Sequence, residues 1–138
     1  MIMGTASGVW ILPEMGLFRA TIGVESPRER GPVSYVADAL VDTCSDSTWI
    51  PRSILESLGI RVERRRAFIV ADGRRVERDI GYAIVHAGGT STIDDVVFAE
   101  DSDFPILGVR SLEGLNLRVD PVRKQLVDAG PMLAVSAA

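Results

Sequence analysis

Apolar and polar residues alternate along much of this chain, which predicts a structure built mainly from β-strands. Residues 17–24 alternate with the two-residue period of a strand that has one buried face. Residues 33–41 are nearly all apolar at their end, which predicts a strand buried on both faces. A charged turn containing Pro and Gly separates these two segments, so we expect a hairpin. Further strands are predicted over 61–70, 80–87, 90–99 and 124–127, with an edge strand over 9–12.

Turn residues indicate where the later strands reverse direction. Residues 68–76 predict a strand, an Asp-Gly turn and a second strand. The Gly-Gly pair at 88–89 predicts the turn before the next strand. The three consecutive arginines at 64–66 are expected to form a solvated stretch rather than a binding patch.

Two short helices are also predicted. Pro51 is suited to the first position of a helix and Gly59 to its C-terminal cap. Because the aliphatic residues between them have helical spacing, we expect a two-turn helix over 51–58 that packs on the core. A second short helix is predicted near 111–115.

The composition favours one folded domain. The chain has 138 residues, of which 46% are hydrophobic, and this argues against intrinsic disorder. We expect the domain to span 17–128, after a loosely ordered segment 1–16 and before a tail 129–138. With 15 basic and 19 acidic residues the net charge is −4, whereas a nucleic-acid-binding protein would be basic.

The chain has one cysteine, Cys44, and one histidine, His86. These numbers exclude an internal disulfide and argue against a metal site built from Cys or His, so no metal or other cofactor is expected. No apolar stretch is long enough to span a bilayer. The N-terminal apolar patch also lacks the preceding basic residue of a signal peptide. We therefore expect a cytoplasmic protein that binds neither membranes nor nucleic acids.

The clearest chemical signal lies in the stretch 39–51. An apolar run delivers Asp42 into a polar turn, and Pro51 then starts the predicted helix. An acid at the end of a buried strand costs free energy unless hydrogen bonds or chemistry retain it. Asp42 is therefore either a catalytic carboxylate or an ordinary acid that caps a loop at the end of a strand.

The motif Asp42-Thr43-Cys44-Ser45 resembles the Asp-Thr-Gly-Ala active-site loop of retropepsin-like aspartic peptidases. An Ile-Leu-Gly motif at 106–108 follows about sixty residues later, with a Gly-tipped hairpin between them. From 17 to 127 the order of parts is similar to that of bacterial single-domain members. That order is hairpin, Asp-Thr loop, Pro-started helix, hairpin, strand pair, Ile-Leu-Gly, short helix and a Val-Asp-Pro-Val terminal strand.

The resemblance implies an all-β fold with one or two short helices, closed into a small β-barrel in which 106–108 passes beside the Asp42 loop. It implies a homodimer, because each chain carries one catalytic aspartate and two are needed. Two Asp42 carboxyls would share one proton and activate a water that hydrolyses a peptide or protein substrate. Asp120 does not supply the second carboxyl, because Pro121 follows it in place of a hydroxyl residue.

The resemblance also implies roles for the residues around Asp42. Thr43 would bond the partner chain or be an ordinary loop residue. Ser45 would donate to a carboxylate oxygen or bond its own backbone. The hairpin at 70–75 would be a flap that folds over the substrate. The residues expected to bind substrate are Asp46, paired with Arg110, and Val70, Ala71, Asp72, Gly73, Ile106, Leu107 and Gly108.

Cys44 stands where the family motif has Gly. Gly serves where a backbone needs unusual angles or close approach, so the cysteine is expected to crowd or strain the loop at the dimer axis. A cysteine nucleophile is disfavoured, because His86 is the only histidine that could serve as its base. The expected function is therefore an aspartic endopeptidase. The alternative is an inactive module of the same fold that binds peptides or dimerises.

Overall fold

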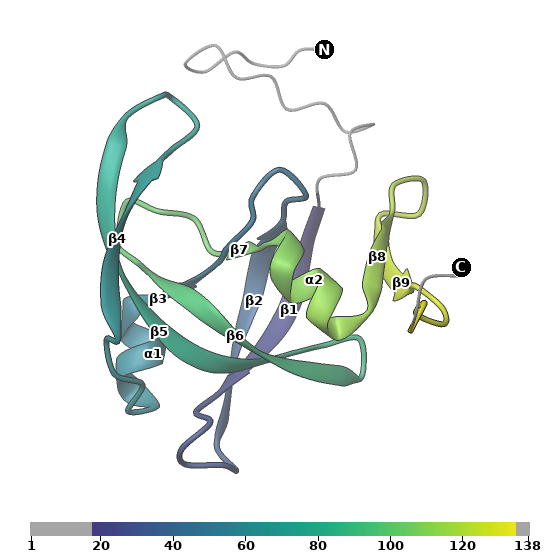
Figure 1. Ribbon diagram of the computed structural model, residues 1–138, viewed down its shortest axis with the longest axis horizontal. Helices are drawn as coiled ribbons and strands as arrows, with labels where there is room; N and C mark the ends of the chain where they lie inside the picture. The colour runs from purple at the N-terminus through teal and green to yellow at the C-terminus, as the bar shows by residue number, and fades with distance from the viewer. Residues whose placement is uncertain (1–17, 135–138) are drawn as a thin grey trace.

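The strands of this protein form a ring-like sheet (Figure 1). The computed structural model describes residues 18–134. Seven strands pair in the order β1-β2-β7-β3-β6-β5-β4, and β1 also pairs with β5, which closes six of them into a ring. The last two strands pair with each other in a separate sheet. The elements are β1 (Phe18–Glu25), β2 (Val33–Val41), β3 (Thr48–Pro51), α1 (Arg52–Ser57), β4 (Arg64–Ile69), β5 (Arg75–Ala87), β6 (Thr90–Ala99), β7 (Ile106–Leu107), α2 (Val109–Leu115), β8 (Leu117–Asp120) and β9 (Gln125–Asp128).

The ring encloses the main hydrophobic core. Ile22, Val85 and Phe98 are fully buried there on three different strands. Leu55 from α1 and Leu112 from α2 complete the same cluster, so the two helices are held by their apolar side chains. The mostly β fold with two short helices agrees with the sequence pattern.

The first hairpin forms as predicted, but its second strand is buried on one face only. Val36, Ala39 and Val41 of β2 are buried, whereas Ala37 and Asp38 between them are exposed. The expectation of a strand buried on both faces was wrong, because no other element covers this outer face in the described part of the chain. Because small apolar residues also lie on the exposed face, the composition of β2 is similar to that of a strand buried on both faces.

Strand β5 is longer than predicted. It runs without interruption over 75–87, where the sequence pattern suggested separate strands on either side of a polar stretch. The polar residues Glu77, Arg78 and Asp79 lie within the strand and pair with β4. Their charged side chains are accommodated by ion pairs, so they did not mark a loop.

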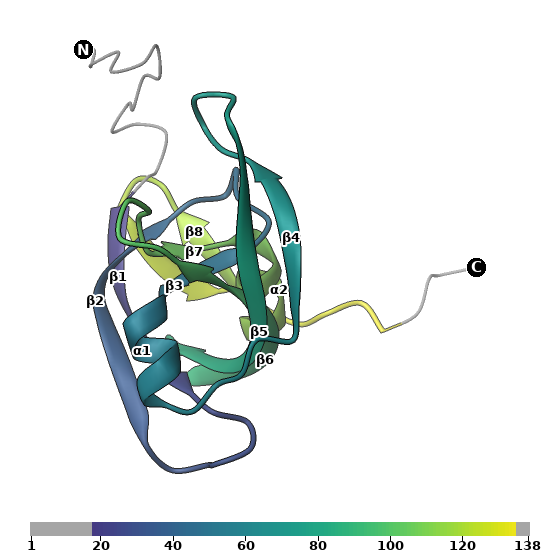
Figure 2. The ribbon, with the colours of Figure 1, turned by 90° about the vertical axis from the view of Figure 1, so that its left-hand side faces the viewer.

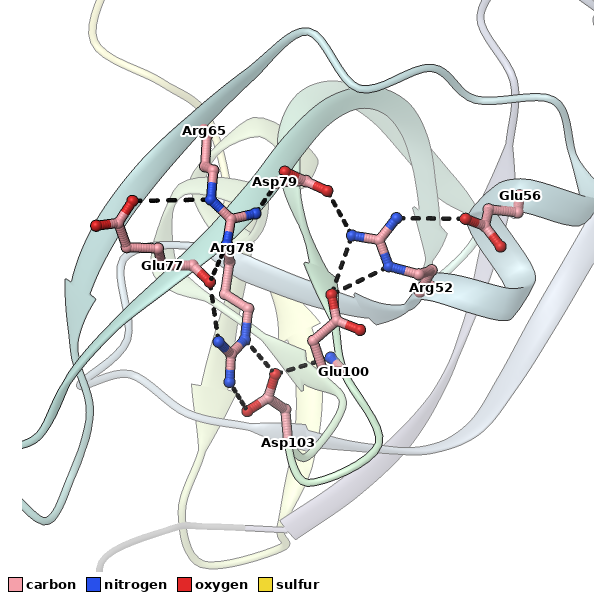
Figure 3. Close-up of polar contacts among 8 residues, drawn as sticks. All are labelled: Arg52, Glu56, Arg65, Glu77, Arg78, Asp79, Glu100 and Asp103. Atoms are coloured by element: carbon pink, nitrogen blue, oxygen red, sulfur yellow. Dashed lines mark hydrogen bonds and ion pairs between the residues drawn. The ribbon is translucent and has the colours of Figure 1, made fainter.

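These ion pairs belong to a network of eight residues (Figure 3). Arg52, at the start of α1, contacts Asp79 at 2.5 Å and Glu100 at 3.0 Å. Arg65 contacts Asp79 at 2.9 Å. Arg64 pairs in the same way with Asp95 on β6. Arg65 and Arg66 are exposed, as expected of a solvated stretch, whereas Arg64 is half-buried beside Asp95.

The most enclosed pair of this network joins Arg78 to Asp103 (Figure 3). The guanidinium donates from two nitrogens, at 2.7 and 2.9 Å, and the two side chains are only 14% and 12% exposed. The Asp103 carboxylate also accepts from the Glu100 N–H at 2.8 Å. Burial acts to raise the pKa of Asp103, but the bonds from Arg78 and Glu100 outweigh it and lower that pKa.

We expect Arg78→Met to lower the free energy of unfolding by about 2 kcal/mol, because it leaves the Asp103 carboxylate nearly buried without its cation. Urea unfolding at neutral pH measures this loss. Arg28→Met is the matched control, because the Arg28–Glu63 pair at 3.3 Å is more exposed and should contribute little. Since the pKa of Asp103 is lowered by folding, the stabilisation is full above its unfolded pKa and disappears as pH falls through the folded value. Equal losses in the two variants would contradict this account.

One strand was missed by the sequence analysis, and several boundaries moved. Residues 48–51 form β3, because they pair with β6 and contact β7, although their polar surroundings suggested a loop. The helix then begins at Arg52, one residue after Pro51. The strand predicted over 124–127 is β9, displaced by one residue and paired with β8. The edge strand predicted over 9–12 lies outside the described residues.

Candidate active site

Asp42 follows directly after β2 and opens a short loop that ends at β3. Its backbone N–H donates to the carbonyl of Leu107 at 3.1 Å, which continues the parallel pairing of β2 with β7. Its carboxylate Oδ1 accepts from the N–H of Cys44 at 2.8 Å. The side chain is half-buried, so the other carboxylate positions remain open to a ligand. The 106–108 segment therefore passes beside the Asp42 loop, as the resemblance implied.

The start of α2 supports the Asp42 loop through backbone hydrogen bonds. The N–H groups of Val109 and Arg110 donate to the carbonyls of Ser45 and Asp46, at 2.8 and 3.1 Å. The first N–H groups of a helix have no partner within the helix, so the loop satisfies two of them. Gly108 packs so closely against this loop that an added Cβ would lie 2.9 Å from the Asp46 carbonyl oxygen. This close packing against the loop explains why Gly occupies position 108, and contact with substrate is not needed to explain it.

Buried hydroxyl groups also stabilise the junction between β7 and α2. The Gly108 N–H donates to Thr48 Oγ1 at 3.0 Å, and the hydroxyls of Thr48 and Ser111 lie 2.6 Å apart. Ser111 Oγ donates in turn to Asp94 Oδ2 at 2.9 Å, so the Thr48 hydroxyl must be the donor to Ser111. Thr48 and Ser111 are completely buried. The chain of bonds ties the β7–α2 junction to β3 and β6.

Asp94 and Asp95 at the end of this chain differ in their acidity. Burial raises the pKa of Asp94, and its contact with Asp95 raises it further. Burial acts the same way on Asp95, but its bonds with Asp94 and Arg64 outweigh it and lower its pKa. Arg110 contacts both acids, with Asp94 Oδ1 at 3.1 Å. The predicted side-chain pairing of Arg110 with Asp46 was therefore wrong, because the arginine side chain turns toward β6 and only its backbone N–H reaches Asp46.

The hydrogen bond of the Ser45 hydroxyl decides between the two roles predicted for this residue. Its hydroxyl donates to the carbonyl of Ser47 at 2.9 Å, so it bonds the backbone two residues further on. Donation to the Asp42 carboxylate, the other alternative, is not made. Thr43 and Cys44 are both exposed on this single chain. Their surface is therefore available to a second copy.

Cys44 adopts a backbone conformation that suits any residue. Among the described residues other than glycine, only Asn116 and Lys124 have a positive φ. The expectation that the cysteine holds a strained backbone position was wrong, because the turn is closed by the Asp42 carboxylate and not by a left-handed residue. Crowding between two copies of Cys44 across a dimer axis stays a prediction.

We expect Cys44→Gly to lower the free energy of unfolding of the protomer by about 0.5–1 kcal/mol, because Gly gives the unfolded chain more freedom and relieves no strain here. Cys44→Ser keeps a Cβ and is the matched control, which should stay close to the native value. Urea unfolding at a protein concentration low enough to give monomers measures both. A Gly variant more stable than the Ser variant would show that the loop is strained after all.

The Asp42 loop and the β4–β5 hairpin line one pocket of about 740 Å³. The tip of the hairpin projects beyond the ring on the same side as the β2–β3 loop (Figures 1 and 2). The turn is closed by a bond from the Gly73 N–H to the Val70 carbonyl at 2.8 Å, and Gly73 has a φ of 88°. Of the expected site residues, the pocket is lined by Asp42, Cys44, Ser45, Asp46, Val70, Ala71, Asp72 and Ile106.

Four expected site residues do not line this pocket. Leu107 and Gly108 are buried in the core and beneath the loop, so the expectation that they contact substrate is replaced by a positioning role. Thr43 and Gly73 are exposed beside the pocket without forming its wall. The hairpin tip is further shaped by Asp72, whose pKa is lowered by bonds from the N–H and side chain of Arg74.

The apolar wall of the pocket was not predicted from the sequence. Trp49 on β3 and Phe68 on β4 lie with ring centroids 5.2 Å apart, and Val76 and Ile106 pack beside them. All four line the pocket. Trp49 was not predicted to line the pocket because residues 48–51 were taken for a loop. Phe68 was not predicted to line it because it was assigned only to a hairpin. The two-residue period of β4, which places Phe68 and Val70 on one face, was the signal available.

No other site of catalytic or metal-binding type stands out in residues 18–134. His86 is bonded through Nε2 to Glu25 Oε1 at 2.8 Å, and the pKa of Glu25 is lowered to about 2, chiefly by its bond with Arg30. The bond with Glu25 gives His86 a structural role. Groups of three or more His, Cys, Asp or Glu side chains suited to a metal ion do not occur in this part of the chain. Neither of its two helices is long and apolar enough to cross a membrane.

Comparison with known proteins supports the fold through structure alone. Neither protein-family models nor curated protein sequences match this chain. Among solved structures it is similar to the retroviral protease-like domain of Ddi1 from Leishmania major, with a TM-score of 0.51 and 18% sequence identity. The match covers 80% of this chain and 88% of that domain. The chain therefore has a retropepsin-like fold.

Proposed function

We propose that this protein is a homodimeric aspartic endopeptidase of the retropepsin type, with one Asp42 from each chain in its active site. The observation that carries the proposal is the position of Asp42. On a retropepsin-like fold it lies half-buried at a strand end, in a pocket that the β4–β5 hairpin also lines. A loop-capping acid would require neither the pocket nor the hairpin.

The proposed dimer supplies what a single chain lacks. Asp120 accepts from the N–H groups of Val122 and Arg123 in the β8–β9 turn, so it acts as a turn residue. β8 and β9 lie on the far side of the ring from the β4–β5 hairpin (Figure 1). In the proposed dimer the second carboxyl is the Asp42 of a second copy, and the exposed Thr43 and Cys44 are available for contact with that copy.

The proposed chemistry uses the two carboxyls in different states. Like charges held close together cannot both ionise readily, so the pair shares one proton. The ionised member acts as general base toward a bound water, and the protonated member polarises the carbonyl of the scissile bond. Proton transfer to the nitrogen then releases the amine. The support from α2 and Leu107 fixes the loop, which keeps each carboxyl in position.

The second candidate is a binding module of the same fold without peptidase activity. The exposed Cys44 beside Asp42 favours it, because a side chain replaces the Gly of the motif where two loops would meet. Such a module would still bind peptides in the pocket, and its Asp42 would serve only to close the loop through the Cys44 N–H.

Incubation with a peptide mixture derived from a whole proteome, at steps between about pH 3 and 7, tests the proposal. We expect new cleavage products that a pepstatin-type transition-state mimic suppresses and a metal chelator leaves unchanged. Sedimentation of the same sample should show a dimer at the concentrations where cleavage occurs. Activity from a strict monomer would contradict the two-chain site. Peptide binding without any cleavage would support the module.

A further inference from the structure

The inner face of β4 places one arginine in the pocket beside its aromatic wall. Side chains of a strand alternate between faces, so Arg64, Arg66, Phe68 and Val70 lie on the same side. Phe68 packs against Trp49, and Val70 lies next to the hairpin turn. Arg66 lines the pocket together with both of them.

Arg66 differs from the other arginines of the pocket in its partners. Arg74 pairs with Asp72 at 2.7 Å, and Arg110 pairs with Asp94 at 3.1 Å. Within residues 18–134 no ion pair or hydrogen bond of the Arg66 guanidinium is formed, whereas Arg64 and Arg65 on the same strand are both paired with acids. The guanidinium therefore remains available for a carboxylate from outside this chain.

We propose that Arg66 selects substrates that carry an aspartate or glutamate side chain near the cleaved bond. This inference rests on the proposed peptidase function and adds a substrate class to it. A guanidinium binds a carboxylate through two parallel hydrogen bonds, which makes it a selective partner for acidic side chains. The neighbouring Trp49 and Phe68 would hold an apolar residue of the same peptide.

The acid should not lie at the cleaved bond itself. Asp42 and Asp46 line the same pocket and bring negative charge to the end formed by the loop. An acidic residue there would be repelled, whereas one at the Arg66 end would be attracted. The expected substrate has an acidic residue at one fixed position outside the two residues that form the scissile bond.

The test compares octapeptides that share a central Phe-Leu pair and carry one Glu at each remaining position in turn, with matched Gln peptides. At about pH 6 a glutamate is ionised. We expect the native protein to cleave the Glu peptide about fivefold more efficiently than the Gln peptide at one position. Arg66→Ala should remove this preference, and Arg66→Glu should replace it with a preference for Lys. Arg118→Ala, an arginine of β8 outside the pocket, is the matched control and should keep it.

A binding measurement keeps this inference separate from the proposed function. The Asp42→Asn protein is titrated with the same fluorescent peptides, and the ratio of dissociation constants for Gln and Glu peptides is measured by anisotropy. A ratio of about five that falls to one in Asp42→Asn/Arg66→Ala supports the role of Arg66, even if the native protein cleaves nothing. A ratio of one in the Asp42→Asn protein, which retains Arg66, would overturn the role of Arg66. A larger ratio that Arg66→Ala leaves unchanged would overturn it too. Neither result would affect Asp42-dependent cleavage by the native protein.

Discussion

Asp42→Asn is expected to lower kcat/KM for peptide cleavage by at least about 10³-fold while the protein remains folded and dimeric. The amide cannot act as the general base of a pair that shares one proton. It can still accept the N–H of Cys44 through its oxygen, so the loop should keep its shape. The measurement is the rate of cleavage of one identified peptide by both proteins under the same conditions.

Asp46→Asn is the matched control for this substitution. Asp46 lines the same pocket, but it lies outside the Asp-Thr motif, and its backbone carbonyl rather than its side chain bonds α2. We expect a change of less than about tenfold, mainly in KM, since only a local charge is lost. Equal losses in both variants would indicate that general pocket charge, rather than a reacting carboxyl, supports cleavage. Unchanged turnover in Asp42→Asn would place the chemistry elsewhere.

Gly108→Ala is expected to have the second largest effect, on stability and activity together. The added Cβ would lie 2.6 Å from the Ser47 carbonyl carbon and 2.9 Å from the Asp46 carbonyl oxygen. Both are backbone atoms of the Asp42 loop, so the clash can be relieved only by moving the loop or α2. We expect a loss of about 3 kcal/mol in the free energy of unfolding. Because the loop moves with its carboxyl, cleavage should fall by about 10²-fold.

Gly130→Ala separates this clash from the general effect of replacing Gly. Gly130 has a φ of 86°, and no atom lies within 4 Å of a Cβ added there. Its variant should lose about 1 kcal/mol from backbone strain alone and keep full activity. Urea unfolding and the peptide assay measure both variants. If Gly108→Ala loses no more than Gly130→Ala, the packing of Gly108 against the loop does not control the site.

Much of the fold could be predicted because local patterns and tertiary structure agree. The Asp-Gly and Gly-Gly turns set two hairpins, and the 90–99 strand has the predicted bounds. The predictions failed where side chains find partners far away in the sequence. Residues 77–79 resemble a loop until the arginines and acids of other segments pair with them.

The candidate site shows the same division. A local motif was enough to single out Asp42 and the hairpin, which the structure brings into one pocket. The sequence could not indicate that Arg110 turns toward Asp94, because that contact depends on how α2 packs against β6. Nor could it indicate that Arg66 is left without an acid while its two neighbours on β4 are paired. These arginines are the same residue type, and they differ only in which acids the folded chain places near them.

Mixing native and Asp42→Asn protomers tests most directly whether the active site is built from two copies of Asp42. The two proteins are exchanged to equilibrium at constant total concentration, and cleavage is measured as the native fraction is varied. If both carboxyls are needed and protomers pair at random, activity follows the square of the native fraction, so a half-native mixture retains about one quarter. Activity that falls in direct proportion, with about one half remaining in that mixture, would show that each chain works alone and would contradict the account.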